Sequence, residues 1–184
     1  MDSQRTTVFL TGFMGAGKTC VGRVLAQRLG WNFADLDDLI VAREGRSVAE
    51  IFSSLGQPAF RRLETEALRA LLNGEPRAGQ IVALGGGAYV QAENRALLRE
   101  ASAPVVHLDA PVDELRRRCA RTADSRPLFQ DENQFRQLYE QRRSAYMKAD
   151  LCVDTCGRNV SEVASEVASL LGLAVPDEQT ETHS

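Results

Sequence analysis

Apolar and polar residues along this chain follow two alternating patterns. Short, largely apolar runs of the kind that buried strands form are found at 8–10, 80–84, 104–108 and 151–154, with a weaker one at 32–37. Apolar residues spaced three or four apart, as on one face of a helix, are found at 18–29, 112–122, 135–146 and 160–171. Because helical patterns lie between the apolar runs, the sequence predicts an α/β fold.

One long stretch, 37–72, has a helical pattern with no strand in it, and it is interrupted at Gly45 and at 56–58. This predicts a helical insertion after the second strand. The chain of 184 residues suits one domain, which we expect to span 1–175. The last residues, 176–184, are polar, and we expect them to be a disordered tail.

Composition narrows the choice of partners. The formal net charge of −3 and the pI of about 5.5 give no general attraction to nucleic acid or anionic lipid, so we expect a small-molecule partner. No apolar run approaches the ~20 residues that span a bilayer, and the first seven residues lack the apolar region of a signal peptide. We therefore expect a cytoplasmic protein, a monomer, with no membrane or nucleic-acid partner.

The stretch Gly12–Thr19 reads Gly-Phe-Met-Gly-Ala-Gly-Lys-Thr, between the strand run 8–10 and the helix pattern 18–29. Glycines in this context let backbone N–H groups surround a polyphosphate, Lys18 can reach the outer phosphates, and the Thr19 hydroxyl can bind Mg²⁺. The chain has only two lysines against twenty arginines, so Lys18 does not reflect a lysine-rich background. The sequence therefore predicts a phosphate-binding loop.

Two acids, Asp35 and Asp37, end the second predicted strand. Alternate residues of an extended chain share a face, so both carboxylates can point into the crevice where α/β sheets bind ligands. This predicts metal or proton chemistry. The alternative is helix capping, a role for which we favour Asp38.

Further candidates lie in the insertion and after the third strand. Arg61 and Glu64 share a helix face, and because neighbouring helical residues point about 100° apart, only one of Arg61 and Arg62 can face the site. The alternative for Arg61 and Glu64 is a surface ion pair. The triple glycine 85–87 follows a strand and allows close approach of backbone to a ligand, although a flexible turn has the same composition.

The segment 123–131 is polar and contains Arg126-Pro127, a composition typical of a mobile lid in a phosphotransferase. Arg126 could then reach the phosphates. The alternative is an exposed loop arginine. On the next helix pattern, 135–146, Arg142 and Arg143 stand side by side.

Together these motifs resemble the shikimate kinase family of P-loop small-molecule kinases, from Thr7 to about Leu171. The carrying stretches are 12–19, 35–37, 45–52, 60–64, 84–87 and 126–128. The resemblance implies a three-layer P-loop kinase fold with a five-stranded parallel sheet, a substrate-binding insertion at about 37–72 and a mobile lid at about 122–132. It also implies ATP-dependent phosphorylation of the shikimate 3-hydroxyl, with Mg²⁺ as cofactor, in the route to chorismate and the aromatic amino acids.

The resemblance further implies roles for individual residues. Catalysis would depend on Lys18, on Asp37 as base and on the lid residue Arg126, while Mg²⁺ would bind Thr19 and Asp35. ATP would contact Gly15, Ala16, Gly17, Lys18, Thr19, Cys20, Arg121 and Arg126, and shikimate would contact Asp37, Arg61, Gly86, Gly87 and Arg143.

Three alternatives remain open at the level of sequence. Arg117 and Arg118 compete with Arg121 for the contact with adenine. A kinase of another small hydroxy acid, such as gluconate, would use the same scaffold. A non-catalytic nucleotide-binding regulator is the third possibility, against which stands the presence of metal, base and lid candidates.

Overall fold

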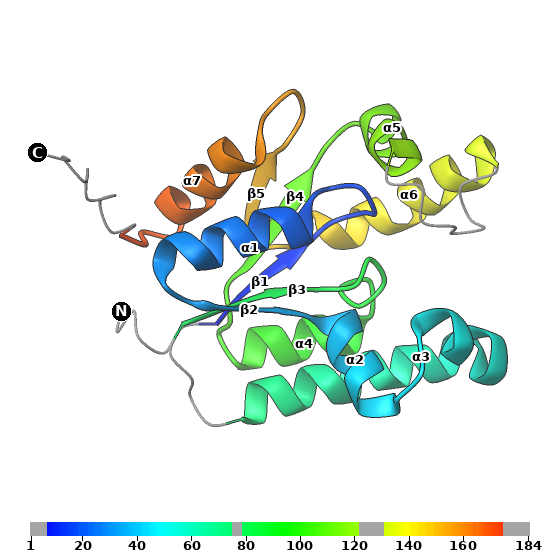
Figure 1. Cartoon of the computed structure of the whole chain (residues 1–184). Helices are drawn as coiled ribbons and strands as arrows, with labels where there is room; N and C mark the ends of the chain where they lie inside the picture. Colours follow the sequence, from blue (N-terminus) through cyan, green and yellow to red (C-terminus); the bar gives the residue numbers. More distant parts are fainter. Residues whose placement is uncertain (1–6, 75–78, 122–130, 175–184) are drawn as a thin grey trace, which may run out of the picture.

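The computed structural model describes residues 7–74, 79–121 and 131–174. Within them, five strands form one parallel sheet in the order β2-β3-β1-β4-β5 (Figure 1). The strands are β1 (Thr7–Thr11), β2 (Asn32–Asp35), β3 (Gln80–Ala83), β4 (Val105–Asp109) and β5 (Leu151–Asp154). The prediction of an α/β fold with a five-stranded parallel sheet is confirmed.

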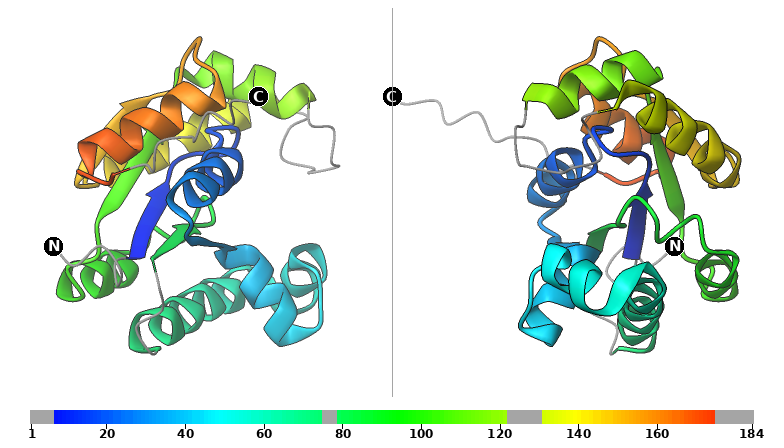
Figure 2. Two further views of the ribbon diagram at one scale, coloured as in Figure 1. Left: turned by 60° about the vertical axis from the view of Figure 1, so that its left-hand side comes forward. Right: turned by 90° about the vertical axis from the view of Figure 1, so that its right-hand side faces the viewer.

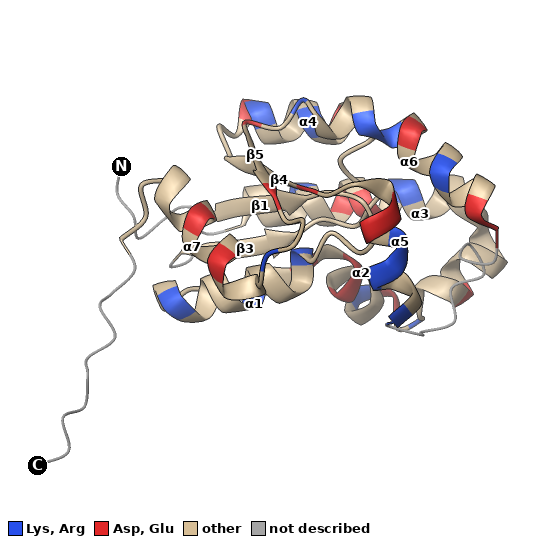
Figure 3. Cartoon of the chain, turned by 90° about the horizontal axis from the view of Figure 1, so that it is seen from above, with Lys and Arg blue, Asp and Glu red and all other residues tan. Residues whose placement is uncertain are grey.

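Helices cover both faces of this sheet, with α1 and α7 on one side and α4 and α6 on the other (Figure 3). Figure 3 also shows that positively and negatively charged residues are interspersed along the helices. The helices are α1 (Lys18–Leu29), α2 (Leu36–Glu44), α3 (Val48–Asn73), α4 (Ala92–Glu100), α5 (Val112–Arg121), α6 (Glu132–Tyr146) and α7 (Val160–Leu170).

The strand register brings the candidate residues to one edge of the sheet. Leu10 of β1 pairs with Ala83, and Asp35 of β2 pairs with the same residue from the other side. In a parallel sheet all carboxyl ends meet at one edge, so the phosphate loop after β1, the acids after β2 and the glycines after β3 are neighbours. Figure 2 shows α5 and α6 on one side of this edge and α2 and α3 on the other.

The helical insertion occurs where the sequence predicts it, as α2 and α3. Gly45 ends α2 in the left-handed conformation (φ 65°), and Ser47 and Glu50 form a reciprocal capping box at the start of α3. Gly56 (φ 77°) kinks α3 two residues before Pro58. The predicted interruptions of the helical pattern therefore correspond to real breaks in the backbone.

The second strand is shorter than predicted, because β2 ends at Asp35 and α2 begins at Leu36. The side chain of Asp35 caps this helix by accepting a hydrogen bond from the N–H of Asp37. Asp35, not Asp38, is thus the capping residue, and the argument that Asp35 and Asp37 share a strand face is wrong. They come together across the first turn of a helix instead.

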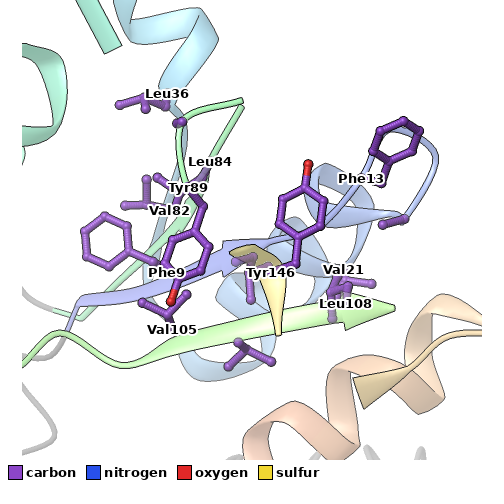
Figure 4. Close-up of a cluster of buried hydrophobic side chains, with 14 of the residues drawn as sticks. Phe9, Phe13, Val21, Leu36, Val82, Leu84, Tyr89, Val105, Leu108 and Tyr146 are labelled. Atoms are coloured by element: carbon purple, nitrogen blue, oxygen red, sulfur yellow. The ribbon is translucent and has the colours of Figure 1, made fainter. Parts of the chain in front are cut away.

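The core lies between the sheet and its helices, and Figure 4 shows Phe9, Val105 and Tyr146 within it. His107 of β4 is buried there and stacks on Tyr146, with ring centroids 5.4 Å apart. Burial holds the pKa of His107 below its ordinary value. Its apolar neighbours in the sequence predict a core or edge histidine at this position, and the structure confirms it.

At the opposite edge of the sheet, the single tryptophan of the chain precedes β2 and packs on Gly79, which precedes β3. A Cβ atom on Gly79 would lie 2.1 Å from ring atoms of Trp31, so only glycine fits beneath the indole. The carbonyl of Gly79 accepts a hydrogen bond from the N–H of Asn32 at 3.0 Å. This contact fixes the amino ends of β2 and β3 to each other.

Candidate active site

The phosphate loop connects β1 to α1 as predicted, and three of its glycines have backbone conformations that other residues rarely adopt. Gly12, Gly15 and Gly17 have φ angles of 146°, 80° and 91°. A Cβ atom on Gly12 would lie 2.5 Å from the carbonyl oxygen of Leu108, which packs the loop against the end of β4. The loop amides and the N-terminus of α1 together form a cradle suited to phosphate.

Lys18 lies across this loop. Its ammonium group donates hydrogen bonds to the carbonyls of Gly12 at 2.9 Å and Phe13 at 3.1 Å. The positive charge is therefore held against the backbone of the phosphate loop.

Thr19 and Asp35 are joined across the start of α1. The Thr19 hydroxyl donates to Oδ2 of Asp35 at 2.9 Å, while Oδ1 of Asp35 accepts from the N–H of Asp37 at 3.1 Å. One carboxylate thus connects the phosphate loop to the first turn of α2. No group of three or more His, Cys, Asp or Glu residues that could hold a metal ion occurs within the residues described, so a metal here would rely on this hydroxyl–carboxylate pair.

Two acids converge on the end of β3. A Cβ atom on Gly85 would lie 2.5 Å from Oδ1 of Asp37 and 3.1 Å from Oε1 of Glu64. The absence of a side chain at Gly85 allows both carboxyl groups to approach the same stretch of backbone. Asp37 is half-buried, and Glu64 is only 1% exposed.

Glu64 is held by two neighbours. Arg61 pairs with it through Nη1 and Oε2 at 2.5 Å, and Gln91 donates to the same oxygen at 3.0 Å. Burial raises the pKa of Glu64 to about 7, against the opposing effect of the Arg61 charge. The surface ion pair that the sequence left as an alternative is therefore a buried one, on the side of α3 that faces Gly85.

Arg61 and Arg62 separate as helix geometry requires. Arg61 is half-buried and its guanidinium lies against Gly87, where a Cβ atom would come within 2.0 Å of Nη1. Arg62 is exposed. Arg61 is thus the arginine that faces the glycine loop.

On α6, the structure brings Arg142 and not Arg143 to this loop. Arg142 donates to the carbonyl of Gly86 at 3.2 Å, and the hydroxyl of Tyr146, one helical turn further on, donates to the same oxygen. Arg143 is exposed and hydrogen-bonds the side chain of Tyr139. Arg142 thus lies at the glycine loop where Arg143 was expected, since the two side chains point about 100° apart on the helix.

Arg118 is the arginine of α5 that contacts the phosphate loop. Its guanidinium donates to the carbonyl of Gly15 at 3.4 Å and to the carbonyl and hydroxyl of Thr155 at 2.6 and 2.9 Å. Arg117 is exposed and pairs with Glu114, and Arg121 is exposed at the last residue of α5. Among the described contacts, Arg118 therefore reaches the phosphate loop, and the contact of Arg121 with adenine stays a prediction.

Some predicted features cannot be located. Arg126, most of the predicted lid at 122–132 and the predicted tail at 176–184 lie outside the described residues. In the part of the chain that the structure describes, no helix is both long enough and apolar enough to cross a membrane.

Comparison with protein families adds independent information. The family model described as "Shikimate kinase" matches residues 14–171. A shikimate kinase from Geobacter metallireducens is 46% identical over 167 residues, which cover 89% of this chain and 90% of the relative. A second, from Geobacter sulfurreducens, is 45% identical over 174 residues, which cover 93% of each protein.

Comparison with solved structures also finds shikimate kinases. A shikimate kinase from Acinetobacter baumannii in complex with shikimate has a TM-score of 0.81 and 34% sequence identity, over 92% of this chain and 94% of that one. A gluconokinase from Sinorhizobium meliloti 1021 covers 91% of this chain and 92% of its own, with a TM-score of 0.66 at 18% identity. The second likeness shows a common fold alone.

Proposed function

The chain belongs to the shikimate kinase family, as its motifs predicted, and we propose that its site transfers the terminal phosphoryl group of ATP to the 3-hydroxyl of shikimate. The product would be shikimate 3-phosphate, on the route to chorismate and the aromatic amino acids. One observation carries the proposal: the phosphate loop and a cluster of two acids and two arginines around 85–87 meet at the same edge of the sheet.

For ATP, the proposed contacts are the amides from Gly15 to Cys20 and the ammonium group of Lys18. Phosphoryl transfer depends mainly on positioning and on neutralising charge, which a cradle of N–H groups with one fixed cation supplies. Arg121 remains our prediction for the contact with adenine, and Arg118 is the alternative, because it hydrogen-bonds the loop at Gly15.

The pair formed by Thr19 and Asp35 fits Mg²⁺. A hydroxyl and a carboxylate oxygen, 2.9 Å apart, are the hard ligands that this ion prefers, and it usually keeps several waters as further ligands. Mg²⁺ bound with ATP would offset negative charge on the phosphates during transfer. Asp35 also caps α2, so the residue that holds the metal would fix the position of Asp37.

For shikimate, Arg61 and Arg142 are the proposed carboxylate ligands. Planar guanidinium groups match a carboxylate through paired hydrogen bonds, so two of them favour an acid over an uncharged polyol. The backbone at Gly86 and Gly87 would contact the ring, since both glycines lie against these arginines. Arg143 has no part in this proposal.

Asp37 is the proposed base. Its carboxylate would hold the reacting hydroxyl and accept its proton as the new P–O bond forms. Glu64, buried beside it, would orient Arg61 through their ion pair. Arg126 remains our prediction for the residue that closes over the phosphates, and a monomer in the cytoplasm remains our expectation.

The proposed activity is tested by a coupled assay of ADP release with shikimate, quinate and gluconate as acceptors. Turnover should be fastest with shikimate, and Lys18→Ala, prepared in parallel, should lose roughly 10²-fold or more in rate because it lacks the cation of the cradle. That variant also excludes a contaminating kinase as the source of ADP. Faster turnover of gluconate than of shikimate would contradict the proposal.

A further inference from the structure

A cavity lies at the end of the sheet opposite the phosphate loop. Its volume is about 260 Å³, and it is formed where α4 ends and β4 and β5 begin. The strand β4 runs from this cavity, at Val105, to the phosphate-loop edge, at Asp109, a separation of about 13 Å along five residues. The lining residues are Tyr89, Arg95, Leu98, Arg99, Ser102, Ala103, Pro104, Val105, Lys148 and Asp150.

The charges around this cavity do not balance. Three cations line it, Arg95, Arg99 and Lys148, against the single acid Asp150. The carboxylate of Asp150 already accepts a hydrogen bond from the N–H of Val105 at 2.8 Å. The lining of this cavity therefore carries net positive charge, whereas the whole chain has a net charge of −3.

Arg99 and Lys148 have unused hydrogen-bonding capacity, whereas Arg95 is partly used. Arg95 donates to the uncharged carbonyls of Tyr89 and Val90 at 2.8 and 2.6 Å. The side chains of Arg99 and Lys148 make no hydrogen bond or ion pair with any other described residue. Glu100 does not line the cavity, consistent with its position about 100° around α4 from Arg99.

The remaining wall offers a small apolar surface. Leu98 and Val105 line it but are only 1% and 2% exposed, so this surface comes mainly from the half-buried Ala103 and Pro104 at the turn into β4. Tyr89 closes one side, and its hydroxyl donates to the carbonyl of Lys148 at 3.0 Å; Figure 4 shows Tyr89 beside Val105. Cations at the rim beside a small apolar surface suit a molecule with a charged head and a compact apolar body.

We propose that this cavity binds a small organic anion, with a carboxylate or phosphate head between Arg99 and Lys148 and an apolar body of about one ring against Ala103 and Pro104. Both head groups accept charge-assisted hydrogen bonds from guanidinium and ammonium groups, which is the chemistry that they share. The site is separate from the shikimate and ATP sites, because none of its lining residues belongs to the phosphate loop or to the cluster around Gly85.

The proposal is tested by titrating the full chain with benzoate and with phenyl phosphate, followed by calorimetry. Saturating MgADP and shikimate are present throughout, so that the catalytic site is filled. At least one of the two probes should bind saturably. The probe with the higher affinity identifies the preferred head group. Benzylamine, with the same body and the opposite charge, should not bind.

Variants locate the binding. Arg99→Gln and Lys148→Gln should each weaken the preferred probe by about tenfold or more, the usual effect of removing a charge-assisted hydrogen bond. Arg62→Gln is the matched control, since it removes one positive charge from an exposed helix position outside the cavity. All three should retain the parent kcat/KM for shikimate. Absence of saturable binding by either anion, or an equal effect of the three variants, would overturn the proposal.

Discussion

The guanidinium group of Arg61 fills the space beside Gly87 that any side chain at position 87 would need. A Cβ atom there would lie 2.0 Å from Nη1 and 2.2 Å from Cζ of Arg61. The same nitrogen, Nη1, forms the ion pair of Arg61 with Glu64. The position of the arginine therefore depends on a backbone without a side chain.

Gly87→Ala should raise the KM for shikimate by about 10- to 100-fold, because the methyl group displaces Arg61 and removes charge-assisted hydrogen bonds worth about 1.5–3 kcal/mol. Thermal stability should change little, since the atoms displaced are the end of a flexible side chain. Gly86→Ala is the comparison: its Cβ atom would meet Arg142 at 3.5 Å, an ordinary contact. Equal damage in the two variants would contradict this account.

Arg142→Ala should lower kcat/KM for shikimate by about 10- to 100-fold, as expected when one arm of a carboxylate clamp is lost. Arg143→Ala should have a much smaller effect, because its side chain is exposed and directed towards Tyr139. Steady-state kinetics of both variants, with nucleotide affinity measured separately, decide the matter. Greater damage in Arg143→Ala would restore the original assignment.

Asp37→Asn should lower kcat by about 10²- to 10⁴-fold, because a carboxamide can hydrogen-bond the substrate hydroxyl but cannot accept its proton. Its affinity for MgATP should remain close to that of the parent. Asp35→Asn should instead require more Mg²⁺ for half-maximal rate, since it removes a charged ligand. Calorimetric titration of MgATP into both proteins, with rates measured at several Mg²⁺ concentrations, separates the two roles. Loss of MgATP binding in Asp37→Asn alone would reverse them.

The pKa of Glu64 predicts a pH dependence of folding. Burial raises this pKa from 4.5 to about 7, so between these values the folded protein keeps a proton that the unfolded chain has released. The unfolded state binds fewer protons there, and the contribution of Glu64 to stability is therefore lost as the pH rises through about 7. The side chain in Glu64→Gln cannot titrate, so this variant should not show the decrease in stability with rising pH.

Urea denaturation of the parent and of Glu64→Gln between about pH 5 and about pH 8 measures the effect as a difference in unfolding free energy. The variant should gain stability relative to the parent as the pH rises. Glu66→Gln is the control, because Glu66 is exposed and pairs with Arg43 at 3.2 Å. Parallel pH profiles for the parent and Glu64→Gln would show that Glu64 does not titrate in this range.

Sequence reasoning located the features that depend on local pattern. The phosphate loop, the strand runs, the breaks around Gly45 and Gly56 and the separation of Arg61 from Arg62 all follow from spacing and backbone preference. Arg142 could also have been found this way. Phe135, Tyr139, Arg142 and Tyr146 recur at helical spacing along the inner face of α6, and Arg143 does not belong to that series.

Other features could not be predicted because they depend on contacts between distant segments. The burial of Glu64 is one of them, because its spacing from Arg61 fits a surface ion pair equally well, and Gln91 and the loop after β3 decide between the two. Asp35 could be identified as a cap only once the strand was known to end there. The contact of Arg118 with the phosphate loop depends on its bonds to Thr155, thirty-seven residues away, which spacing along α5 does not reveal.

The contact between Trp31 and Gly79 has a practical consequence for spectroscopy. The chain has one strong intrinsic fluorophore, and it lies at the edge of the sheet opposite the phosphate loop. Its emission should change when β2 and β3 separate on unfolding and remain nearly constant when nucleotide or shikimate arrives. Tryptophan fluorescence can therefore report whether each variant is folded, in the same sample in which its activity is measured, without interference from the substrates.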